Sequence, residues 1–179
     1  SIKQKEAVRI AILEAAKNII LKEGWQAVSI RKIADAIGYS LPVVYNHFDS
    51  KDAILGEFVK YGFGMLGEVM SNAKSTSTDP ALQLTAMAKS YFHFAFEQRE
   101  YYQMMFGLGM PSCERTRQIT EIGNFSAILI NSIQSLSNNV NIEEKTLLKF
   151  HTFWSILHGL SSINMVNMTA TPNEMQQSV

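Results

Sequence analysis

The sequence of 179 residues is long enough for one domain, or for a small module attached to a larger one. Its 46% of hydrophobic residues can form a packed core, and a charged fraction of 18%, below the roughly 25% of an average soluble chain, indicates further hidden surface such as a subunit interface or an apolar pocket. Sixteen basic and sixteen acidic residues cancel, which excludes a global attraction to nucleic acid, although residues 1–60 hold nine basic and seven acidic residues and residues 61–179 hold seven and nine.

The cysteine content and the amino-terminal residues bear on the compartment. Cys113 is a single cysteine and cannot form an internal disulfide, which fits a reducing environment. Charged residues such as Lys3 and Lys5 precede any apolar run, unlike the start of a signal peptide. No stretch approaches the roughly 18 consecutive apolar residues of a membrane span. The sequence therefore predicts a cytoplasmic protein without a membrane partner.

Apolar residues recur at helical spacing along nearly the whole chain, beginning with three predicted helices in the first third. The first ends before Gly24, a residue type that tolerates the positive φ often found just past a helix. The second runs from an N-cap at Ser29 to Gly38. The third has Ser40 as its N-cap, a proline in its first turn and an end near His47. The apolar stripe of the first helix consists of Val8, Ile12, Ala15 and Ile19.

Longer helices are predicted for the rest of the chain. A fourth helix opens at Ser50 and forms a link over residues 50–72, and a polar segment at 71–79 follows it. The remaining predicted helices cover about 80–98, the segment up to Phe106, 114–136 and 142–168, and the last ten residues are expected to be frayed. Strand alternation and internal repeats are absent from the sequence, so we expect an all-α chain with an amino-terminal unit at 1–50 and a larger helical unit at 51–179.

Residues 29–47 combine two short helices with a tight turn. Such a pair forms a DNA-binding helix-turn-helix, with its second helix in the major groove, or a simple corner between two helices. The order and spacing of about a dozen surrounding positions favour the first interpretation. They are Ile12-Leu13-x-Ala15-Ala16, Gly24, Ser29-Ile30-x-x-Ile33-Ala34, Gly38-x-Ser40, Tyr45-x-His47-Phe48 and Ser50-Lys51. Together they resemble the DNA-binding module of the tetracycline-repressor (TetR) family over roughly the first 60 residues.

The resemblance implies a three-helix DNA-binding unit, a fourth helix that leads to a larger ligand domain, and dimerisation through the last two helices. It also assigns Tyr45 and His47 to contacts with backbone phosphates. Residue chemistry adds Ser29, with the amide groups at its helix start, and Lys51 in the first turn of the fourth helix. Arg31 is either a phosphate clamp or a solvated charge.

Base readout is predicted to fall to the third helix. Many relatives carry Lys or Arg beside the cap, whereas Leu41, Pro42 and Val43 cannot hydrogen-bond to guanine and can contact thymine methyl groups. Asn46 can pair with adenine, and Leu41 has the alternative of packing against the neighbouring helix. The predicted DNA-binding residues are Ser29, Arg31, Ser40, Leu41, Pro42, Val43, Tyr45, Asn46, His47 and Lys51.

A dense run of aromatic and methionine residues follows the polar segment. Any one of them can be plain core, but as a group they exceed what one helical face buries, and methionine is common at adaptable binding surfaces. We therefore expect a cavity for a small, largely apolar effector between the helices. The predicted ligand-binding residues are Met87, Tyr91, Phe94, Tyr102, Met105, Phe106, Phe125, Trp154 and His158. His158 and His93 have the alternative of being core histidines whose hydrogen bonds are satisfied.

The last long helix has two predicted faces. One face is apolar and contains Leu147, Phe150, Trp154 and Leu157. The other is mostly small and contains Ser155, Gly159, Ser162 and Val166. This combination predicts burial against its own domain together with the close approach of a partner helix, and hence a homodimer through the last two long helices. Trp154 and the His158-Gly159 pair also resemble a Trp-His-Gly class of carboxy-terminal domains within the TetR family, which does not identify a ligand.

Signals for other functions are weak. Gly62-x-Gly64-x-x-Gly67 matches a dinucleotide-binding fingerprint but lies inside a helical run without a preceding strand, so we expect these glycines to loosen the fourth helix instead. His151 and His158 lie about 10 Å apart along one helix, too far to share a metal ion. We find no catalytic constellation and expect no cofactor.

The prediction is therefore a ligand-responsive regulator, a repressor released from a palindromic operator in double-stranded DNA. Two alternatives stay open. One is an all-α lipid- or small-molecule-binding module, or an enzyme, without a DNA function. The other keeps DNA binding but makes the protein an activator or a constitutive architectural binder.

Overall fold

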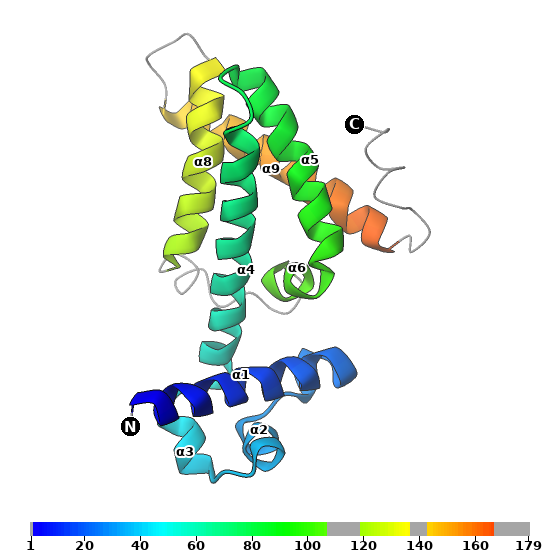
Figure 1. Cartoon of the computed structure of the whole chain (residues 1–179). Coiled ribbons are helices and arrows are strands. Elements are labelled where there is room, and N and C mark those ends of the chain that lie inside the picture. Colours follow the sequence, from blue (N-terminus) through cyan, green and yellow to red (C-terminus); the bar gives the residue numbers. More distant parts are fainter. Residues whose placement is uncertain (1, 107–118, 137–142, 167–179) are drawn as a thin grey trace.

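The computed structural model describes residues 2–106, 119–136 and 143–166, and every regular element in these ranges is a helix (Figure 1). The elements are α1 (Ile2–Glu23), a short 3₁₀ helix η1 (Trp25–Ala27), α2 (Ile30–Ile37), α3 (Leu41–Tyr45), α4 (Lys51–Lys74), α5 (Pro80–Glu97), α6 (Arg99–Phe106), α8 (Thr120–Leu136) and α9 (Glu143–Val166). The prediction of an all-α chain is confirmed for these residues.

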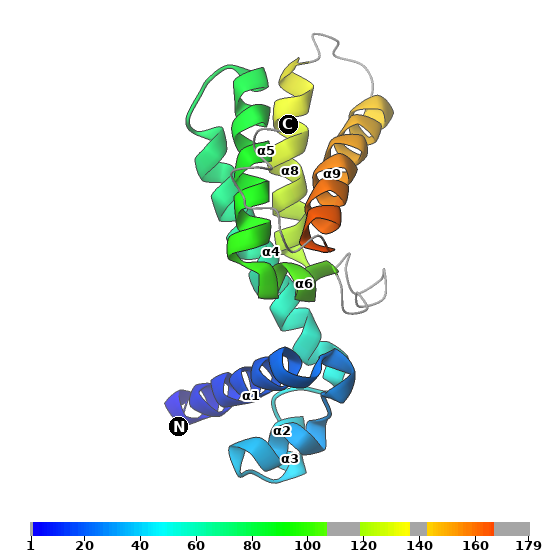
Figure 2. The same ribbon diagram turned by 90° about the vertical axis from the view of Figure 1, so that its right-hand side faces the viewer.

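The helices form two units joined by α4. The helices α1, α2 and α3 lie together at one end of the molecule, and α4 leads from them into a bundle formed with α5, α6, α8 and α9 (Figures 1 and 2). Within the bundle α4 packs against α5, α6 and α8, and α9 packs against α5 and α8. A single helix therefore belongs to both units.

Local side-chain chemistry sets several helix boundaries as expected. The hydroxyl of Ser29 accepts a hydrogen bond from the backbone N–H of Lys32 at 3.1 Å, and Ser50 accepts one from the N–H of Ala53 at 3.1 Å. Gly38 ends α2 with a φ of +71°, a conformation that glycine adopts without a steric penalty. The two caps and the glycine thus fix where the helix-turn-helix begins, turns and hands over to α4.

Two predicted helix ends are wrong, and one predicted cap lacks its hydrogen bond. The third helix ends at Tyr45 instead of His47, because the chain leaves the helix there and places Phe48 in the core. Ser40 occupies the N-cap position of that helix, but its side chain makes no capping hydrogen bond. The fourth helix continues through the polar residues from Ser71 to Lys74, since burial of its neighbouring apolar side chains outweighs their weak helix propensity.

Within the predicted helix at 114–136, the structure describes residues 119–136, and α8 begins there at Thr120. Residues 114–118, the ends of the predicted 142–168 helix beyond Glu143–Val166, and the expected frayed tail lie outside the described residues.

The expected burial of Leu147 is wrong. Helical spacing places Leu147 on the same face of α9 as Phe150 and Leu157, but it is 49% exposed whereas these two are buried. Burial on this face therefore depends on the position along α9 as well as on the side of the helix.

The helix α4 runs without interruption through its glycines, and the expectation that they loosen it stays a prediction. A Cβ atom at Gly62 would overlap the buried side chain of Met105, with the Sδ and Cγ atoms of that methionine closer than any real contact. Gly62 therefore permits the close approach of α6 to α4, which packs these two helices tightly.

Candidate nucleic-acid interface and ligand site

The helix-turn-helix occupies the outer end of the molecule, where α2 and α3 lie on the side of α1 that is remote from the bundle (Figure 2). The direction of α3 is fixed by Val44 and Phe48, which are buried in the small core. Pro42 and Asn46 fall on the opposite face of the helical turn and are exposed. The face of α3 that a groove of DNA can meet is therefore formed around Pro42 and Asn46.

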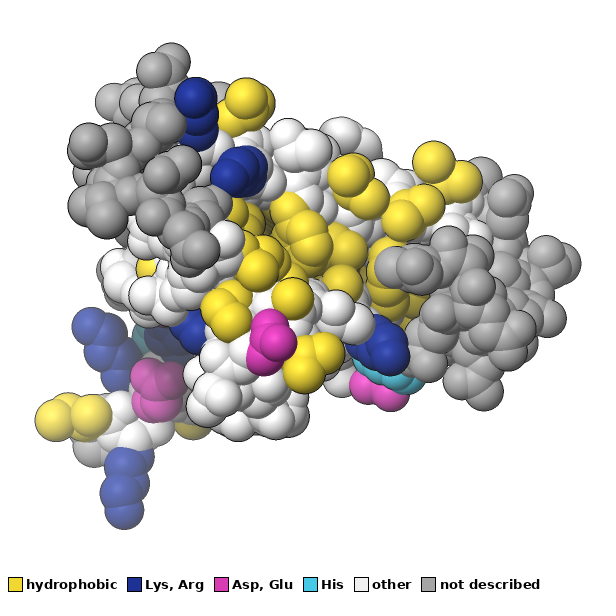
Figure 3. Space-filling model, turned by 90° about the horizontal axis from the view of Figure 1, so that it is seen from above, with side chains coloured by type: hydrophobic (Ala, Val, Ile, Leu, Met, Phe, Trp, Pro, Cys, Tyr) yellow, Lys and Arg dark blue, Asp and Glu magenta, His cyan; other side chains and the backbone are white. Residues whose placement is uncertain are grey.

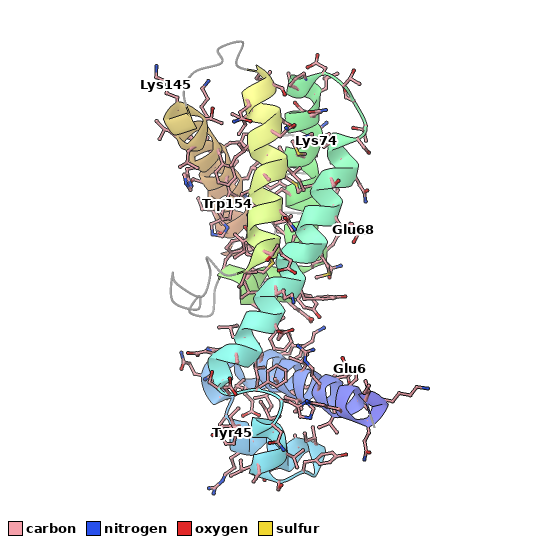
Figure 4. The ribbon with its side chains drawn as sticks, turned by 90° about the vertical axis from the view of Figure 1, so that its left-hand side faces the viewer. Glu6, Tyr45, Glu68, Lys74, Lys145 and Trp154 are labelled. Atoms are coloured by element: carbon pink, nitrogen blue, oxygen red, sulfur yellow. The ribbon has the colours of Figure 1, made fainter. Side chains whose placement is uncertain are left out.

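The predicted phosphate contacts differ in how they are presented. Arg31 and Tyr45 are exposed, Tyr45 to 51%, and the tyrosine lies at the outer end of the molecule (Figure 4). His47 is half-buried, and Ser29 already accepts the N–H of Lys32, which leaves the hydrogen of its hydroxyl for donation. The Lys51 ammonium lies 4.4 Å from the centroid of the Trp25 ring, so its charge is held beside the helix-turn-helix.

The predicted base-contacting residues are also not equivalent. Leu41 and Val43 are half-buried and pack partly against the core, while Pro42 is exposed. A large part of the Leu41 side chain is therefore used for packing, which was the alternative interpretation of this residue. Tyr39 is a further exposed side chain on this surface that the sequence reasoning did not include. It is 45% exposed in the turn between α2 and α3. An aromatic residue directly after the turn glycine is the signal that could have found it.

The small unit is tied to α4 by charged and aromatic groups. The guanidinium of Arg9 on α1 pairs with the carboxylate of Glu57 on α4 at 2.5 Å and lies 5.3 Å from the centroid of the Phe48 ring. Both partners of the ion pair are partly exposed, so its contribution to stability is modest, about 0–1 kcal/mol. Its value here is geometric, because it fixes the angle between α1 and the start of α4.

Inside the bundle, rings from five helices form one aromatic cluster, which consists of Phe63, Tyr91, Tyr102, Phe106, Phe125, Phe150, Trp154 and His158. Ring centroids in the cluster lie between 4.4 Å (Phe106 to His158) and 6.5 Å (Tyr91 to Phe125) apart. The ring of Trp154 on α9 (labelled in Figure 4) lies 5.4 Å from that of Phe125 on α8, between centroids, and it stacks on Phe150. The structure thus brings together most of the predicted ligand residues.

The rest of the predicted set lies beside this cluster. Met87 and Phe94 are buried on the face of α5 that also carries Tyr91, and Met105 is buried on α6 against Gly62. Phe63 on α4 was missed, since the sequence reasoning treated the fourth helix as a link only. It contacts Phe106, Phe125 and Trp154 with its ring, so α4 itself forms part of the aromatic cluster.

A chain of hydrogen bonds crosses the aromatic cluster. The indole N–H of Trp154 donates to the hydroxyl of Tyr91 at 3.2 Å, which lies 3.2 Å from the hydroxyl of Tyr102. The Tyr102 hydroxyl lies 2.5 Å from Nδ1 of His158, and Nε2 of that ring lies 3.4 Å from the hydroxyl of Ser162. Because the indole can only donate, every link is satisfied when each group donates to the next and His158 is neutral with its hydrogen on Nε2.

The surroundings keep this chain uncharged. Burial raises the pKa of Tyr91 far above its ordinary value and raises that of Tyr102. Burial also lowers the pKa of His158, which favours the neutral ring. The cluster therefore presents neutral donors and acceptors within apolar surroundings, and none of its members is Lys, Arg, Asp or Glu.

Contacts from α6 connect the bundle to α1 as well as to α4. The ammonium of Lys17 on α1 lies 3.7 Å from the carboxylate of Glu100 and 4.8 Å from the centroid of the Tyr101 ring. Tyr101 in turn lies 5.3 Å from Tyr61 on α4, between ring centroids. The helix α6 therefore contacts both α4 and α1, the two helices that join the bundle to the small unit.

An apolar stripe runs along the outer face of α9. Leu148, Ile156 and Ile163 are 68%, 56% and 62% exposed, and they recur at spacings of eight and seven residues on one side of the helix. The half-exposed Gly159 lies on the same side. Seen from above, apolar side chains form a band across this end of the molecule (Figure 3). We define Leu148, Ile156, Gly159 and Ile163 as the α9 stripe.

The described residues hold no group of three or more His, Cys, Asp or Glu side chains able to bind a metal ion. Among the same residues, no helix is long and apolar enough to cross a membrane.

The comparisons with known proteins identify the family. The family model for bacterial regulatory proteins of the tetR family matches residues 12–58, and the model for the tetracyclin repressor-like carboxy-terminal domain matches residues 84–179. The chain belongs to the TetR family. The matching families and the relatives of this TetR-family chain are transcriptional regulators and not enzymes, which confirms that part of the prediction.

Two curated relatives illustrate the sequence similarity. The HTH-type transcriptional activator FasR of Mycolicibacterium smegmatis is 30% identical over 95 residues, which cover 53% of this chain and 43% of FasR. The HTH-type transcriptional repressor KstR2 of Rhodococcus jostii is 33% identical over 87 residues, or 46% of this chain and 43% of KstR2. The TetR-family chain thus spans less than half of the length of these relatives.

Solved structures share the fold over nearly the whole chain. A TetR-family transcriptional regulator from Bordetella parapertussis covers 96% of this chain and 91% of its own, with a TM-score of 0.69 at 18% identity. The regulator FadR from Bacillus subtilis, solved in complex with stearoyl-CoA, covers 94% and 95% with a TM-score of 0.72 at 16% identity. At these identities the likeness concerns the fold alone.

Proposed function

We propose that this chain is a dimeric, ligand-responsive, DNA-binding regulator that represses transcription in the cytoplasm until an effector releases it from a palindromic operator. The observation that carries the proposal is the position of α4. This helix begins beside the helix-turn-helix and contributes Phe63 to the aromatic cluster. A ligand that rearranges the aromatic cluster therefore acts directly on the helix that positions the DNA-binding unit, residues 1–50, against the remainder, residues 51–179.

For DNA, we assign the exposed and half-buried polar groups around α2 and α3 to the phosphate backbone. Ser29 at the start of α2, together with Arg31, Tyr45 and His47, supplies donors on the outer surface of the unit. Lys51 adds a positive charge at the start of α4. Ser40, which makes no capping hydrogen bond, is a further donor beside the reading face of α3. These contacts position the protein and carry no base information.

For the effector, we assign a largely apolar molecule with one polar group. The aromatic cluster offers ring surface for a hydrocarbon chain, and the hydrogen-bond chain from Trp154 to Ser162 offers neutral partners for a single polar group. A multiply charged head group would lack buried counter-charges there and would be costly to desolvate. The FadR structure that shares this fold contains stearoyl-CoA, and this supports an acyl chain as the apolar part.

For the assembly, we assign the dimer contact to α8 and α9. The α9 stripe leaves large apolar side chains in water in a single chain, and burying them against a second copy removes this cost. Gly159 within the stripe allows a partner helix to approach closely. Two-fold symmetry then requires an operator with two half-sites in palindromic order.

We propose that the two sites communicate through the contacts of α6 with α4 and with α1. Met105 packs into the space left by Gly62 on α4, and Glu100 pairs with Lys17 on α1. An effector between α5, α6 and α9 shifts α6, and α6 moves α4 and α1 together. A shift of these helices changes the separation of the two reading helices in the dimer and lowers operator affinity.

The test combines selection of bound DNA with ligand screening. Selection from fragmented genomic and random DNA is expected to return one palindrome, and binding should weaken as salt is raised. Long-chain fatty acids should raise the melting temperature and should release the selected DNA. At a free-ligand concentration of 100 times the dissociation constant, binding should stabilise the folded state by about 2.7 kcal/mol. Polar metabolites of similar size serve as controls.

Two results would contradict the proposal in different ways. Failure to select any DNA, with ligand binding intact, would favour the alternative of a lipid-binding module without a DNA function. Stabilisation and release by highly charged metabolites only would overturn the apolar effector. A reporter placed behind the selected operator measures the sign of regulation, which matters because the relatives include both an activator and a repressor.

A further inference from the structure

The reading face of α3 has an unusual chemistry. Within Leu41–Tyr45 there is no acidic or basic residue, and the exposed first turn presents the ring of Pro42 and part of Val43. Neither side chain has a hydrogen-bond donor or acceptor, so the first turn cannot form the bidentate pairs that read guanine or adenine. The apolar group that base edges offer in the major groove is the methyl group on C5 of thymine.

We propose that Pro42 and Val43 recognise C5-methyl groups, so that each half-site carries thymine under the first turn of α3. This inference rests on the proposed DNA-binding function and adds the chemical class of the bases that are read. Leu41 and Val43 are both half-buried and pack partly against the core, so only the exposed part of each can reach a base, and Pro42, which is exposed, is the main contact. The proposal excludes a guanine read by the first turn.

The geometry of the turn also places a second contact. Pro42 and Asn46 lie four residues apart on the exposed face, which corresponds to about 6 Å along a helix. Successive bases on one strand are about 3.4 Å apart, so a helix along the groove sets these residues about two base pairs apart. Asn46 can form paired hydrogen bonds to adenine. The expected half-site therefore has a methyl-bearing position and, about two base pairs away, an adenine.

Proline near the start of a helix also has a purely structural use, because its fixed φ favours helix initiation. That role predicts a loss of stability on substitution and no dependence on a DNA methyl group. Pro42 is exposed, and neither it nor its neighbour Val43 carries a hydrogen-bonding side-chain group, which points instead to an apolar contact in the groove. The two roles are separable by changing the DNA and leaving the protein intact.

The experiment replaces single thymines of the selected half-site by deoxyuridine, which removes the methyl group and keeps every hydrogen-bonding group. Each contacted methyl should weaken binding about fourfold, the equivalent of one buried methylene. Deoxyuridine at thymines outside the half-site is the control and should have no effect. If DNA is selected but deoxyuridine is neutral throughout the half-site, methyl recognition is wrong while DNA binding stands. If no DNA is selected, the proposed function itself fails.

Protein variants then connect a methyl group to a side chain. In Val43→Ala and Pro42→Ala, the deoxyuridine penalty should shrink at one position each, because the contact has already been lost. Tyr45→Phe is the matched control, since it should weaken binding to both DNAs equally and leave the penalty intact. A full penalty in both alanine variants would show that other residues contact the methyl groups, and would overturn the assignment to Pro42 and Val43.

Discussion

The two units of this molecule bury different kinds of side chain. The small unit has a mainly aliphatic core around Ile12, Ile33 and Val44, with Trp25 and Phe48 at its edge, and the polar groups proposed to bind DNA lie on its surface. The bundle has a core of rings threaded by a chain of hydrogen bonds, and the groups proposed to bind the effector are the core itself. Function and stability should therefore be separable by mutation in the first unit and inseparable inside the second.

The largest expected effect comes from the surface of the bundle. There, unlike in its core, a mutation should abolish function without unfolding the chain. Ile163→Asp places a charge in the α9 stripe and should convert the dimer to a monomer, because the charge would be buried at the interface. Loss of the second half-site contact should weaken operator binding by about a hundredfold or more. Light scattering and gel-shift titration measure the two effects.

Leu82→Asp is the control for that variant, because Leu82 is 58% exposed on α5 and lies outside the stripe. It should stay dimeric. An Ile163→Asp protein that also stays dimeric refutes the α9 stripe as the interface. Ile163 is a better probe than Ser162, whose hydroxyl belongs to the hydrogen-bond chain with His158.

Inside the bundle, Tyr102→Phe should affect both stability and ligand response. The change removes the hydroxyl that links Tyr91 to His158, and a buried hydrogen bond lost in this way costs about 1–3 kcal/mol. Thermal unfolding should show the loss, and effector binding should weaken in the same variant. Tyr61→Phe, at a tyrosine that is 59% exposed, should change neither. A stable Tyr102→Phe protein with normal ligand response would contradict the coupling of stability and function.

In the small unit, Tyr45→Ala should weaken DNA binding without loss of stability. A contact to a charged phosphate contributes about 1.5–3 kcal/mol, so affinity should fall by about tenfold or more for every sequence, while the melting temperature is retained. Lys51→Ala should also reduce the slope of log affinity against log salt by about one. Gel shifts at several salt concentrations check both. Unchanged affinity in both variants would remove the phosphate assignment.

A pair of glycines tests the close packing of α4 against α6. Gly56 has nothing within 4 Å of its virtual Cβ, so Gly56→Ala should stabilise the helix by about 1 kcal/mol. Gly62→Ala should lower the free energy of unfolding, because the new methyl overlaps the buried Met105 side chain. Denaturant titration of both variants gives the signs. Equal stabilisation by the two changes would show that Met105 and α6 can move aside without a loss of stability.

The smallest effect concerns pH. The pKa of His158 is lowered by burial, so below its ordinary value of about 6.5 the folded protein binds fewer protons than the unfolded chain. The stabilising contribution of the neutral ring is complete above that value and is lost as pH falls through the lowered pKa. In His158→Gln, the melting temperature should therefore fall less steeply between pH 7 and pH 5. His151→Gln, at an exposed histidine, should keep the original slope.

The same difference between the units explains what the sequence could predict. Ser29, Gly38 and Ser50 act on their own neighbours in the chain, so the boundaries that they set were foreseeable from spacing alone. The aromatic and methionine run was foreseeable as a group. Its members meet through contacts between distant segments, such as Tyr102 with His158, 56 residues apart, and spacing within one helix carries no signal for these.

The misses follow the same logic. Phe63 lies on a helix that the sequence presented as a link, and only the packing of α4 inside the bundle makes it part of the aromatic cluster. Leu147 lies on the same helical face as the buried Phe150 and Leu157, so its exposure depends on which part of α9 the neighbouring helices cover, and tertiary packing sets this. The assignments of residues to phosphates, bases and the effector remain predictions, both from the sequence and from the structure.

The uninterrupted course of α4 has a mechanical consequence. Phe63 lies 12 residues after Lys51, so about 18 Å of rigid helix separates the aromatic cluster from the start of the helix-turn-helix. A lever of that length converts a tilt of about 5° at Phe63 into a displacement of about 1.6 Å at the DNA end. In a symmetric dimer both levers swing, and the two displacements add across half-sites that the duplex spaces at about 34–36 Å. Under the proposed function, an effector that tilts α4 by a few degrees would therefore put the two reading helices out of register with the groove.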